Sequence, residues 1–232
     1  ITRLEQCSSP EDWIGQLLLC VYQATDNSSE KTFNAAKSVA EAIGAEFLDH
    51  NIQSLVDGYL DLISGAIGRS LNWNDDDVPL QNIQARTRGP GVWLLANLKK
   101  AILVATSNRS EAAVGYATMD GDTSGGLSPV GGIDKAFLRR WLIWLEMEGS
   151  KLIPTIPALK YVNGLQPTAE LRPSDRGQTD ESDLMPYPVL DAIERAAIRD
   201  KRAPLAVYIL IREQFPDYPA PQHVCELTYD LI

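Results

Sequence analysis

The pattern that most constrains the fold is an apolar run, a helical segment and a second apolar run near the start of the chain. Leu17–Gln23 (LLLCVYQ) is almost continuous in apolar side chains, which is typical of a strand buried on both faces of a parallel sheet. Glu30–Ile43 has helical periodicity and is followed by Gly44, a common helix stop. Ala45–Asp49 then begins a second strand. This order predicts a right-handed βαβ unit and a parallel sheet.

The rest of the chain alternates helical patterns with one more apolar run. Helices are expected over Gln53–Ile67, Val78–Leu98 (with an interruption near Gly89-Pro90-Gly91), Ile133–Met147, Val189–Asp200 and Leu205–Gln214. Ala101–Ala105 (AILVA) is predicted to be a third buried strand, and Trp141, Leu142 and Leu145 are expected to pack on the sheet. The polar, proline-containing Ser150–Asp183 is predicted to be a lid or a mobile loop. The predicted class is α/β with a doubly wound parallel sheet, whose ligands sit beyond the carboxyl ends of the strands.

Composition excludes several classes of function. The 232 residues suit one large domain or two small ones, and the formal charge of −10 argues against a broad nucleic-acid surface. Only two histidines and three scattered cysteines are present, too few for a zinc site or a histidine-based triad. No apolar run reaches the ~20 residues that span a membrane, and no signal-peptide core is evident. We therefore expect a soluble, cytoplasmic protein.

Candidate ligand-binding residues follow the predicted strand Ala101–Ala105. The Thr106 hydroxyl can donate to and accept from a nucleotide, and Glu111 offers the carboxylate oxygen that Mg²⁺ prefers. The alternative is purely structural: Ser110 caps a helix and Glu111 favours its dipole. The local pattern leaves both open.

Further charged residues lie on both sides of this segment. Arg86 and Arg88 could give bidentate contacts to phosphate or carboxylate, but two helical side chains two apart diverge, so only one should face a site. Asp122 belongs to a glycine-rich loop that a ligand could approach closely. Lys135 opens a helix, where a cation opposes the dipole unless an anion compensates it. The sequence SGGLS at 124–128 lacks the aspartate of an SGGxDS pyrophosphate loop and is rejected as one.

Several motifs in a fixed order resemble the synthetase domain of NAD⁺ synthetase. They are NIQARTR at 82–88, ATSNRSEAAVGYATMDGD at 105–122, a proline six residues before Lys135, and PTAELRPSDRGQTDESDLMPY at 167–187. The segment QATDNSSEKTFNAA at 23–36 is similar to the form fused to a glutamine-hydrolysing domain. The resemblance covers roughly residues 17–194.

This resemblance implies an adenine nucleotide alpha-hydrolase-like, Rossmann-like fold that forms homodimers. It implies ATP-dependent amidation of deamido-NAD⁺ with Mg²⁺. The nicotinate carboxylate attacks the α-phosphate of ATP, pyrophosphate leaves, and ammonia then displaces AMP from the acyl-adenylate. Deamido-NAD⁺ and ATP are the substrates, and a glutaminase domain outside this chain is the expected source of ammonia.

The resemblance also assigns roles by position. Gln23, Thr106, Lys135 and Thr168 resemble ATP contacts, Glu111 the Mg²⁺ ligand, and Arg86 a deamido-NAD⁺ contact. Asp122 is similar to the aspartate near the nicotinate and ammonia positions, so Asp122 and Lys135 are the predicted catalytic residues. Ammonia-using relatives have an aspartate in place of Gly126 and a lysine in place of Met119, and those contacts are not carried over.

Some family features are missing from residues 1–232. The SGGxDS loop expected just before the first strand is absent, as are the second Mg²⁺ ligand it carries and the glutaminase domain. The His-Lys or Lys-Arg segment expected near the dinucleotide is not evident in PQHVCELTYDLI. We therefore expect a synthetase domain that lacks its first segment and is inactive alone. The alternatives are a non-catalytic nucleotide-binding or dimerisation fragment and another ATP-pyrophosphatase amidotransferase.

Overall fold

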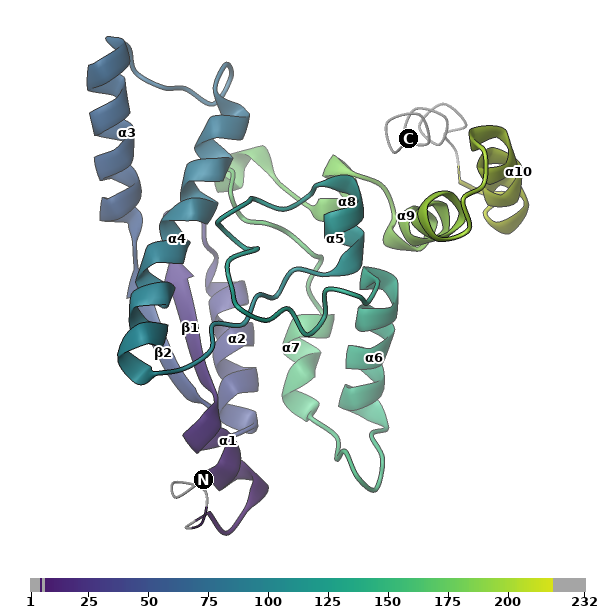
Figure 1. Ribbon diagram of the computed structural model, residues 1–232, viewed down its shortest axis with the longest axis horizontal. Helices are drawn as coiled ribbons and strands as arrows, with labels where there is room; N and C mark the ends of the chain where they lie inside the picture. Colours follow the sequence, from purple (N-terminus) through teal and green to yellow (C-terminus); the bar gives the residue numbers. More distant parts are fainter. Residues whose placement is uncertain (1–4, 6, 219–232) are drawn as a thin grey trace.

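The computed structural model describes residue 5 and residues 7–218, and its only named sheet within them contains two parallel strands. Strands β1 (Leu19–Ala24) and β2 (Glu46–Asn51) pair from Leu19 opposite Glu46 to Ala24 opposite Asn51. Helix α2 (Glu30–Ala42) connects them and begins where the Ser29 side chain accepts a hydrogen bond from Thr32 N (Figure 1). The predicted βαβ unit and its parallel pairing are confirmed.

A short helix that the sequence analysis did not predict precedes β1. Helix α1 (Pro10–Leu17) starts with a capping box in which Ser9 and Asp12 exchange hydrogen bonds between side chain and backbone. Proline at the first helical position is already compatible with the required backbone angle. These local signals are present in the sequence, although the short helix buries no residue fully.

Two long helices lie side by side at one edge of the molecule. Helix α3 has the predicted bounds, Gln53–Ile67, and ends at Gly68 in the left-handed conformation. Helix α4 (Asp77–Lys99) is continuous through Pro90, so the predicted interruption does not occur. The charged loop before α4 is tied down because Arg69 holds Asp76 through two hydrogen bonds of 2.7 Å.

The prediction of a strand over Ala101–Ala105 is wrong, because these residues form no strand with the rest of the described chain. It makes a single parallel bridge between Val104 and Leu127, with Ala105 N donating to Leu127 O over 2.8 Å. Ile102 is 71% exposed and Val104 43% exposed, so only Ala105 of this segment is buried. An apolar run becomes a strand only where a neighbouring strand supplies the backbone partners.

The remaining elements follow this segment. They are α5 (Arg109–Val114), α6 (Lys135–Met147), η1 (Pro157–Leu159), α7 (Lys160–Asn163), η2 (Ser174–Arg176), α8 (Asp180–Asp183), α9 (Tyr187–Glu194), a π-helical turn η3 (Arg195–Arg199) and α10 (Pro204–Gln214). Helix α6 packs against η1, α7, α9 and α5, so its expected packing on the sheet is wrong. Short helices and polar contacts order the predicted lid over Ser150–Asp183.

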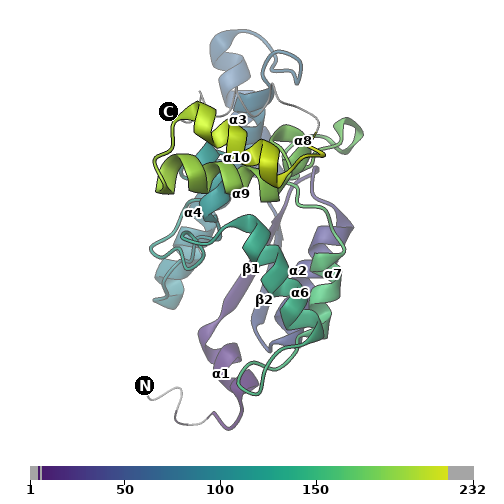
Figure 2. The same ribbon diagram turned by 90° about the vertical axis from the view of Figure 1, so that its right-hand side faces the viewer.

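An apolar cluster lies between α9 and α10, which lie side by side in Figure 2 and away from the two strands in Figure 1. Tyr187, Ile193 and Val207 are each 0% exposed, and Ala136 of α6 joins the same cluster. The cluster therefore fixes α6 against α9. Among the described residues, none of the helices combines the length and apolarity needed to cross a membrane. The segment PQHVCELTYDLI, in which the expected His-Lys or Lys-Arg pair is not evident, lies outside the described residues.

Candidate functional site

Glu111 and Lys135 face each other across the start of two helices. The Lys135 Nζ lies 2.8 Å from Glu111 Oε1, and both side chains are largely shielded from solvent. Helix α5 is capped by Asn108, not by Ser110 as the structural alternative proposed: Asn108 accepts from Glu111 N, and Glu111 Oε2 accepts from Asn108 N. Glu111 therefore serves the capping box with one oxygen and Lys135 with the other. Its role as a Mg²⁺ ligand stays a prediction.

A second carboxylate lies on the other side of Lys135. Asp180 Oδ2 is 3.8 Å from Lys135 Nζ and accepts a hydrogen bond of 2.8 Å from Tyr187 Oη. Asp180 is only 4% exposed, and its Oδ1 is buried without a hydrogen-bond partner among the described residues. Burial raises the pKa of Asp180, whereas the bond from Tyr187 and the charge of Lys135 act in the opposite direction. The ammonium group thus lies between two carboxylates.

The two arginines of the 86–88 motif diverge as expected. Arg86 is exposed on α4, and its Nε donates to Met119 O over 3.0 Å. Arg88 turns toward the carboxyl end of β1, where its Nε donates to Gln23 O and the Gln23 side chain donates back to Arg88 O. Burial lowers the pKa of Arg88. Sequence reasoning chose Arg86 and missed that Arg88 lies beside Gln23.

The loop containing Asp122 lies against α4. Asp122 Oδ1 accepts from Thr118 N over 2.7 Å, and Thr118 Oγ1 in turn bonds Asn82 Oδ1 of α4. Loss of water raises the pKa of Asp122, and the charge of Glu111 raises it further, whereas Arg88 lowers it. The charges of Glu111 and Arg88 thus act on the Asp122 carboxyl group in opposite directions.

The remaining predicted contacts are Thr106 and Thr168. Thr106 is exposed, immediately after the Val104 bridge. Thr168 Oγ1 accepts from Glu170 N over 3.2 Å, and Glu170 Oε2 receives hydrogen bonds from Ser29 N and Thr32 Oγ1 at the start of α2. The loop that carries Thr168 is thus attached to the end of the βαβ unit. No hydrogen bond joins Thr168 to Thr106 among the described residues.

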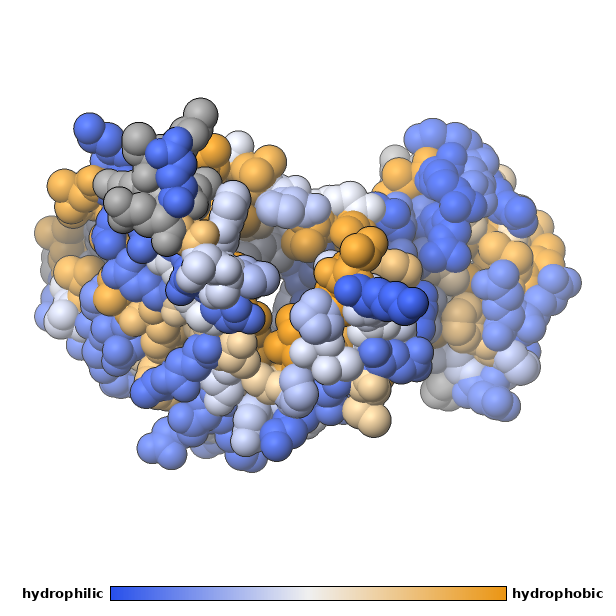
Figure 3. All heavy atoms as spheres, turned by 90° about the horizontal axis from the view of Figure 1, so that it is seen from below, coloured by the Kyte–Doolittle hydropathy of each residue, from blue (hydrophilic) through white to orange (hydrophobic). Residues whose placement is uncertain are grey.

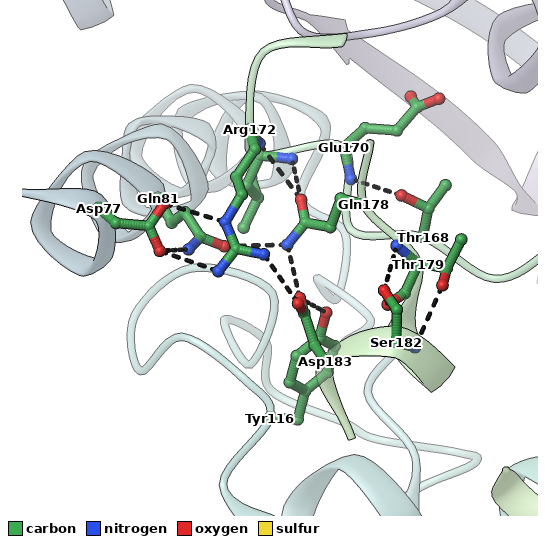
Figure 4. Close-up of polar contacts among 11 residues, drawn as sticks. Asp77, Gln81, Tyr116, Thr168, Glu170, Arg172, Gln178, Thr179, Ser182 and Asp183 are labelled. Atoms are coloured by element: carbon green, nitrogen blue, oxygen red, sulfur yellow. Dashed lines mark hydrogen bonds and ion pairs between the residues drawn. The ribbon is translucent and has the colours of Figure 1, made fainter. Parts of the chain in front are cut away.

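A polar network around Arg172 holds this loop in place (Figure 4). Arg172 donates to both oxygens of Asp77 on α4 and to Asp183 on α8. Gln178 extends the network, since its Oε1 accepts from the backbone of Leu171 and Arg172 while its Nε2 donates to Asp183. The network places Thr168 and Asp180 through contacts that are distant in sequence.

The side chains around Glu111 can supply only part of the coordination shell of a magnesium ion. Mg²⁺ usually takes one or two carboxylates and completes its shell with phosphate oxygens and water. Glu111 supplies such a carboxylate, with Ser107 Oγ bonded to it at 3.2 Å. Within the ranges that the structure describes, no group of three or more His, Cys, Asp or Glu side chains could hold a metal. These residues fit an ion that a triphosphate brings with it, and they do not fit an all-protein cage.

Comparison with known proteins places the chain in a family. A sequence profile described as NAD synthase matches residues 15–209. The chain belongs to the NAD synthase family. It is 33% identical over 184 residues to a glutamine-dependent NAD(+) synthetase of Aquifex aeolicus, covering 79% of this chain and 30% of that protein. The corresponding protein of Bos taurus is 29% identical over 235 residues, covering 94% of this chain and 33% of the other.

Solved structures agree with the sequence relatives. A glutamine-dependent NAD(+) synthetase from Cytophaga hutchinsonii superposes with a TM-score of 0.78 at 37% identity, covering 95% of this chain and 34% of that one. An NMN synthetase from Francisella tularensis, at 19% identity and a TM-score of 0.63, shares the fold. The present NAD synthase chain spans about a third of the length of the glutamine-dependent relatives.

Proposed function

We propose that the chain is the synthetase part of a glutamine-dependent NAD⁺ synthetase, which amidates deamido-NAD⁺ at the expense of ATP. The observation that carries the proposal is the Lys135–Glu111 pair, 2.8 Å apart, in a chain of the NAD synthase family. The nicotinate carboxylate attacks the α-phosphate and releases pyrophosphate; ammonia then attacks the acyl carbon and releases AMP. Ammonia would come from a glutaminase domain outside this chain. An SGGxDS segment, also outside it, would complete the pyrophosphate site.

The charged pair suits the first half of this reaction. The Lys135 ammonium would bind ATP phosphate oxygens and stabilise the negative charge that grows on the leaving pyrophosphate. Glu111 would hold Mg²⁺, which neutralises phosphate charge when bound. Binding ATP then requires Lys135 to share or release Glu111, and Asp180, at 3.8 Å, remains as its second anionic neighbour. Gln23, Thr106 and Thr168 would contact the nucleotide from the ends of their segments.

The second half of the reaction is assigned to the loop beside α4. Arg86 would bind deamido-NAD⁺, and its exposed guanidinium is supported from behind by Met119 O. Asp122 would accept a hydrogen bond from ammonia next to the acyl carbon. This carboxylate is oriented by Thr118 N and is close enough to Glu111 for their charges to interact.

Apolar surfaces of the described residues support a larger sheet and a homodimer. Cys20 and Val21 of β1, with α2 and Val162, line an apolar cavity of about 260 Å³. Figure 3 shows a hollow on one face with apolar side chains along part of its rim. Further strands beside β1 would make the doubly wound sheet. Leu55, Leu62 and Ile67 of α3 are at least half exposed, which supports a homodimer through that helix.

The test uses the full-length gene product that carries this chain, supplied with deamido-NAD⁺, ATP, Mg²⁺ and ammonia. Ammonia makes the assay independent of glutamine hydrolysis. Lys135→Ala and Glu111→Gln should each lower kcat by a factor of about 10² to 10³. Glutamine keeps an acceptor for the Asn108 capping box, so folding should be retained. Lys37→Ala is the control, because Lys37 makes only an exposed ion pair with Glu41.

Thermal unfolding of each variant separates loss of chemistry from loss of structure. Unchanged turnover in Lys135→Ala and Glu111→Gln would refute the assigned site. ATP binding without any NAD⁺ formation by the wild-type protein would favour the alternative of a non-catalytic nucleotide-binding module.

A further inference from the structure

The first turn of α6 is bound by side chains from three different helices or caps. Phe137 N donates to Asp134 Oδ1 over 2.7 Å, which is the ordinary N-cap bond. Lys135 N donates to Ser110 Oγ of α5 over 2.8 Å, and Ala136 N donates to Asp191 Oδ2 of α9 over 3.0 Å. Helix N-termini usually leave such N–H groups to solvent or to one cap residue. Here each has its own acceptor.

The two long-range acceptors are also bonded to each other. Ser110 Oγ donates to Asp191 Oδ1, so the hydroxyl uses its hydrogen for Asp191 and a lone pair for Lys135 N. Ser110 is 0% exposed and Asp191 2% exposed. A buried carboxylate is costly unless it is fully hydrogen-bonded, and both oxygens of Asp191 are used. The three helices are therefore joined at one dry point.

This point lies next to the charged pair of the site. Ser110 directly precedes Glu111, and the backbone N–H bound by Ser110 belongs to Lys135 itself. A shift of α5 relative to α6 would change the Ser110–Lys135 bond and the Glu111–Lys135 distance together. Asp191 has no bond to either charged group; it acts on the backbone and on the hydroxyl.

We propose that Asp191, acting through Ser110, is a positioning residue that keeps the Lys135 ammonium and the Glu111 carboxylate in register. The structural part stands on the contacts above. Its consequence for catalysis rests on the proposed function, in which Lys135 and Glu111 bind ATP phosphates and Mg²⁺. Asp191 lies on α9, 56 positions after Lys135 at the start of α6. Helix α9 thereby determines the geometry of the phosphate site.

Two variants weaken the junction without adding volume. In Asp191→Asn the amide oxygen can still accept from Ala136 N, but the amide nitrogen then faces Ser110 Oγ, whose hydrogen loses its acceptor. In Ser110→Ala the Lys135 N–H loses its acceptor. Val207→Ala is the matched control, because Val207 is 0% exposed in the same apolar cluster but lies on α10 and takes no part in the junction.

The first measurement reports the position of the Lys135 side chain and does not depend on catalysis. The rate at which an amine-specific reagent labels Lys135 is followed by peptide mass spectrometry in the full-length protein, with exposed Lys37 as internal reference. Asp191→Asn and Ser110→Ala should raise the labelling rate of Lys135 several-fold, because the ammonium separates from Glu111. Val207→Ala should lower Tm without changing that rate.

The second measurement is ammonia-dependent NAD⁺ synthesis per folded molecule. Both junction variants should lower kcat by about 10- to 100-fold, with the KM for deamido-NAD⁺ unchanged. If Asp191→Asn lowers Tm as Val207→Ala does but leaves Lys135 labelling and kcat at wild-type values, Asp191 is only structural and the proposal is wrong. If Lys135→Ala itself does not affect synthesis, the proposed function fails, while the labelling rates still decide whether the junction positions Lys135.

Discussion

Replacing Arg172 with methionine should release the loop that carries Thr168 and Asp180. The Arg172 guanidinium donates to Asp77 Oδ1 and Oδ2 over 2.9 and 2.8 Å and to Asp183 Oδ1 over 2.8 Å. Its side chain is only 24% exposed. Methionine keeps much of the apolar stem and removes every donor, so Arg172→Met isolates the polar contribution.

The expected cost follows from the kind of bonds that are lost. Hydrogen bonds to charged groups contribute about 1.5–3 kcal/mol net, but solvent access and side-chain entropy reduce exposed ion pairs to about 1 kcal/mol or less. For this partly exposed fork we expect a loss of about 1.5–3 kcal/mol in the free energy of unfolding. At about 2–4 °C per kcal/mol for a chain of this size, Tm should fall by roughly 3–12 °C.

A double-mutant cycle and hydrogen exchange test this estimate. Arg172→Met, Asp77→Asn and the double variant are compared by thermal unfolding at low salt, where the coupling energy should be about 1–2 kcal/mol. Amide exchange over residues 167–183 should accelerate in Arg172→Met. Arg199→Met is the control, since Arg199 is 65% exposed and pairs with its neighbour Asp200. A coupling energy of zero together with unchanged exchange would refute the reasoning.

Acidification should remove the same contribution. Hydrogen bonds from Arg172 hold the pKa of Asp77 below its ordinary value. A carboxylate with a lowered folded-state pKa stabilises the protein above its unfolded-state pKa, and that stability is lost as pH falls through the folded-state value. The Tm difference between wild type and Arg172→Met should therefore be full at neutral pH and shrink below about pH 4. A difference that persists at lower pH would contradict this.

Two further predictions concern backbone space and acid stability. Gly89→Ala should destabilise the protein by about 1–3 kcal/mol, because a Cβ there would lie 2.9 Å from Asp120 O. Gly65→Ala in α3 should stabilise it by about 0.4–1 kcal/mol, because a Cβ there would meet nothing within 4 Å. Chemical denaturation measures both, and a change in the same direction for the two variants would contradict the prediction. The Arg69 hydrogen bonds lower the pKa of Asp76 to about 2, so Asp76→Asn should lower Tm at pH 7 and progressively less as pH falls toward 2; a pH-independent difference would argue against the pairing.

Local sequence signals predicted much of the secondary structure because they act over short distances. The apolar run before Gln23, the helical period after Ser29 and the stop at Gly44 identified the βαβ unit, and the bounds of α3 were predicted residue for residue. The capping box at Ser9 was equally local but was overlooked. Motif order also predicted the family, which the profile match over residues 15–209 confirms.

Predictions failed where the outcome depends on a partner distant in the chain. Ile102 and its neighbours have the composition of a strand, but pairing needs an adjacent strand, and only Val104 finds one at Leu127. The exposure of Arg86 and the burial of Arg88 could not be read from a motif that contains both. The individual roles of all the candidate site residues remain predictions: Gln23, Arg86, Thr106, Glu111, Asp122, Lys135 and Thr168.

The sequence by itself determined the βαβ unit, most helix limits and the family, since each depends on residue type and spacing along a few turns of chain. Only the tertiary structure decided how the site is held together. Ser110 and Asp191 are 81 residues apart, Arg172 and Asp77 are 95 apart, and Lys135 and Glu111 are 24 apart. Side chains so far apart form hydrogen bonds only after helix packing has brought them within about 3 Å, and no local pattern encodes that distance.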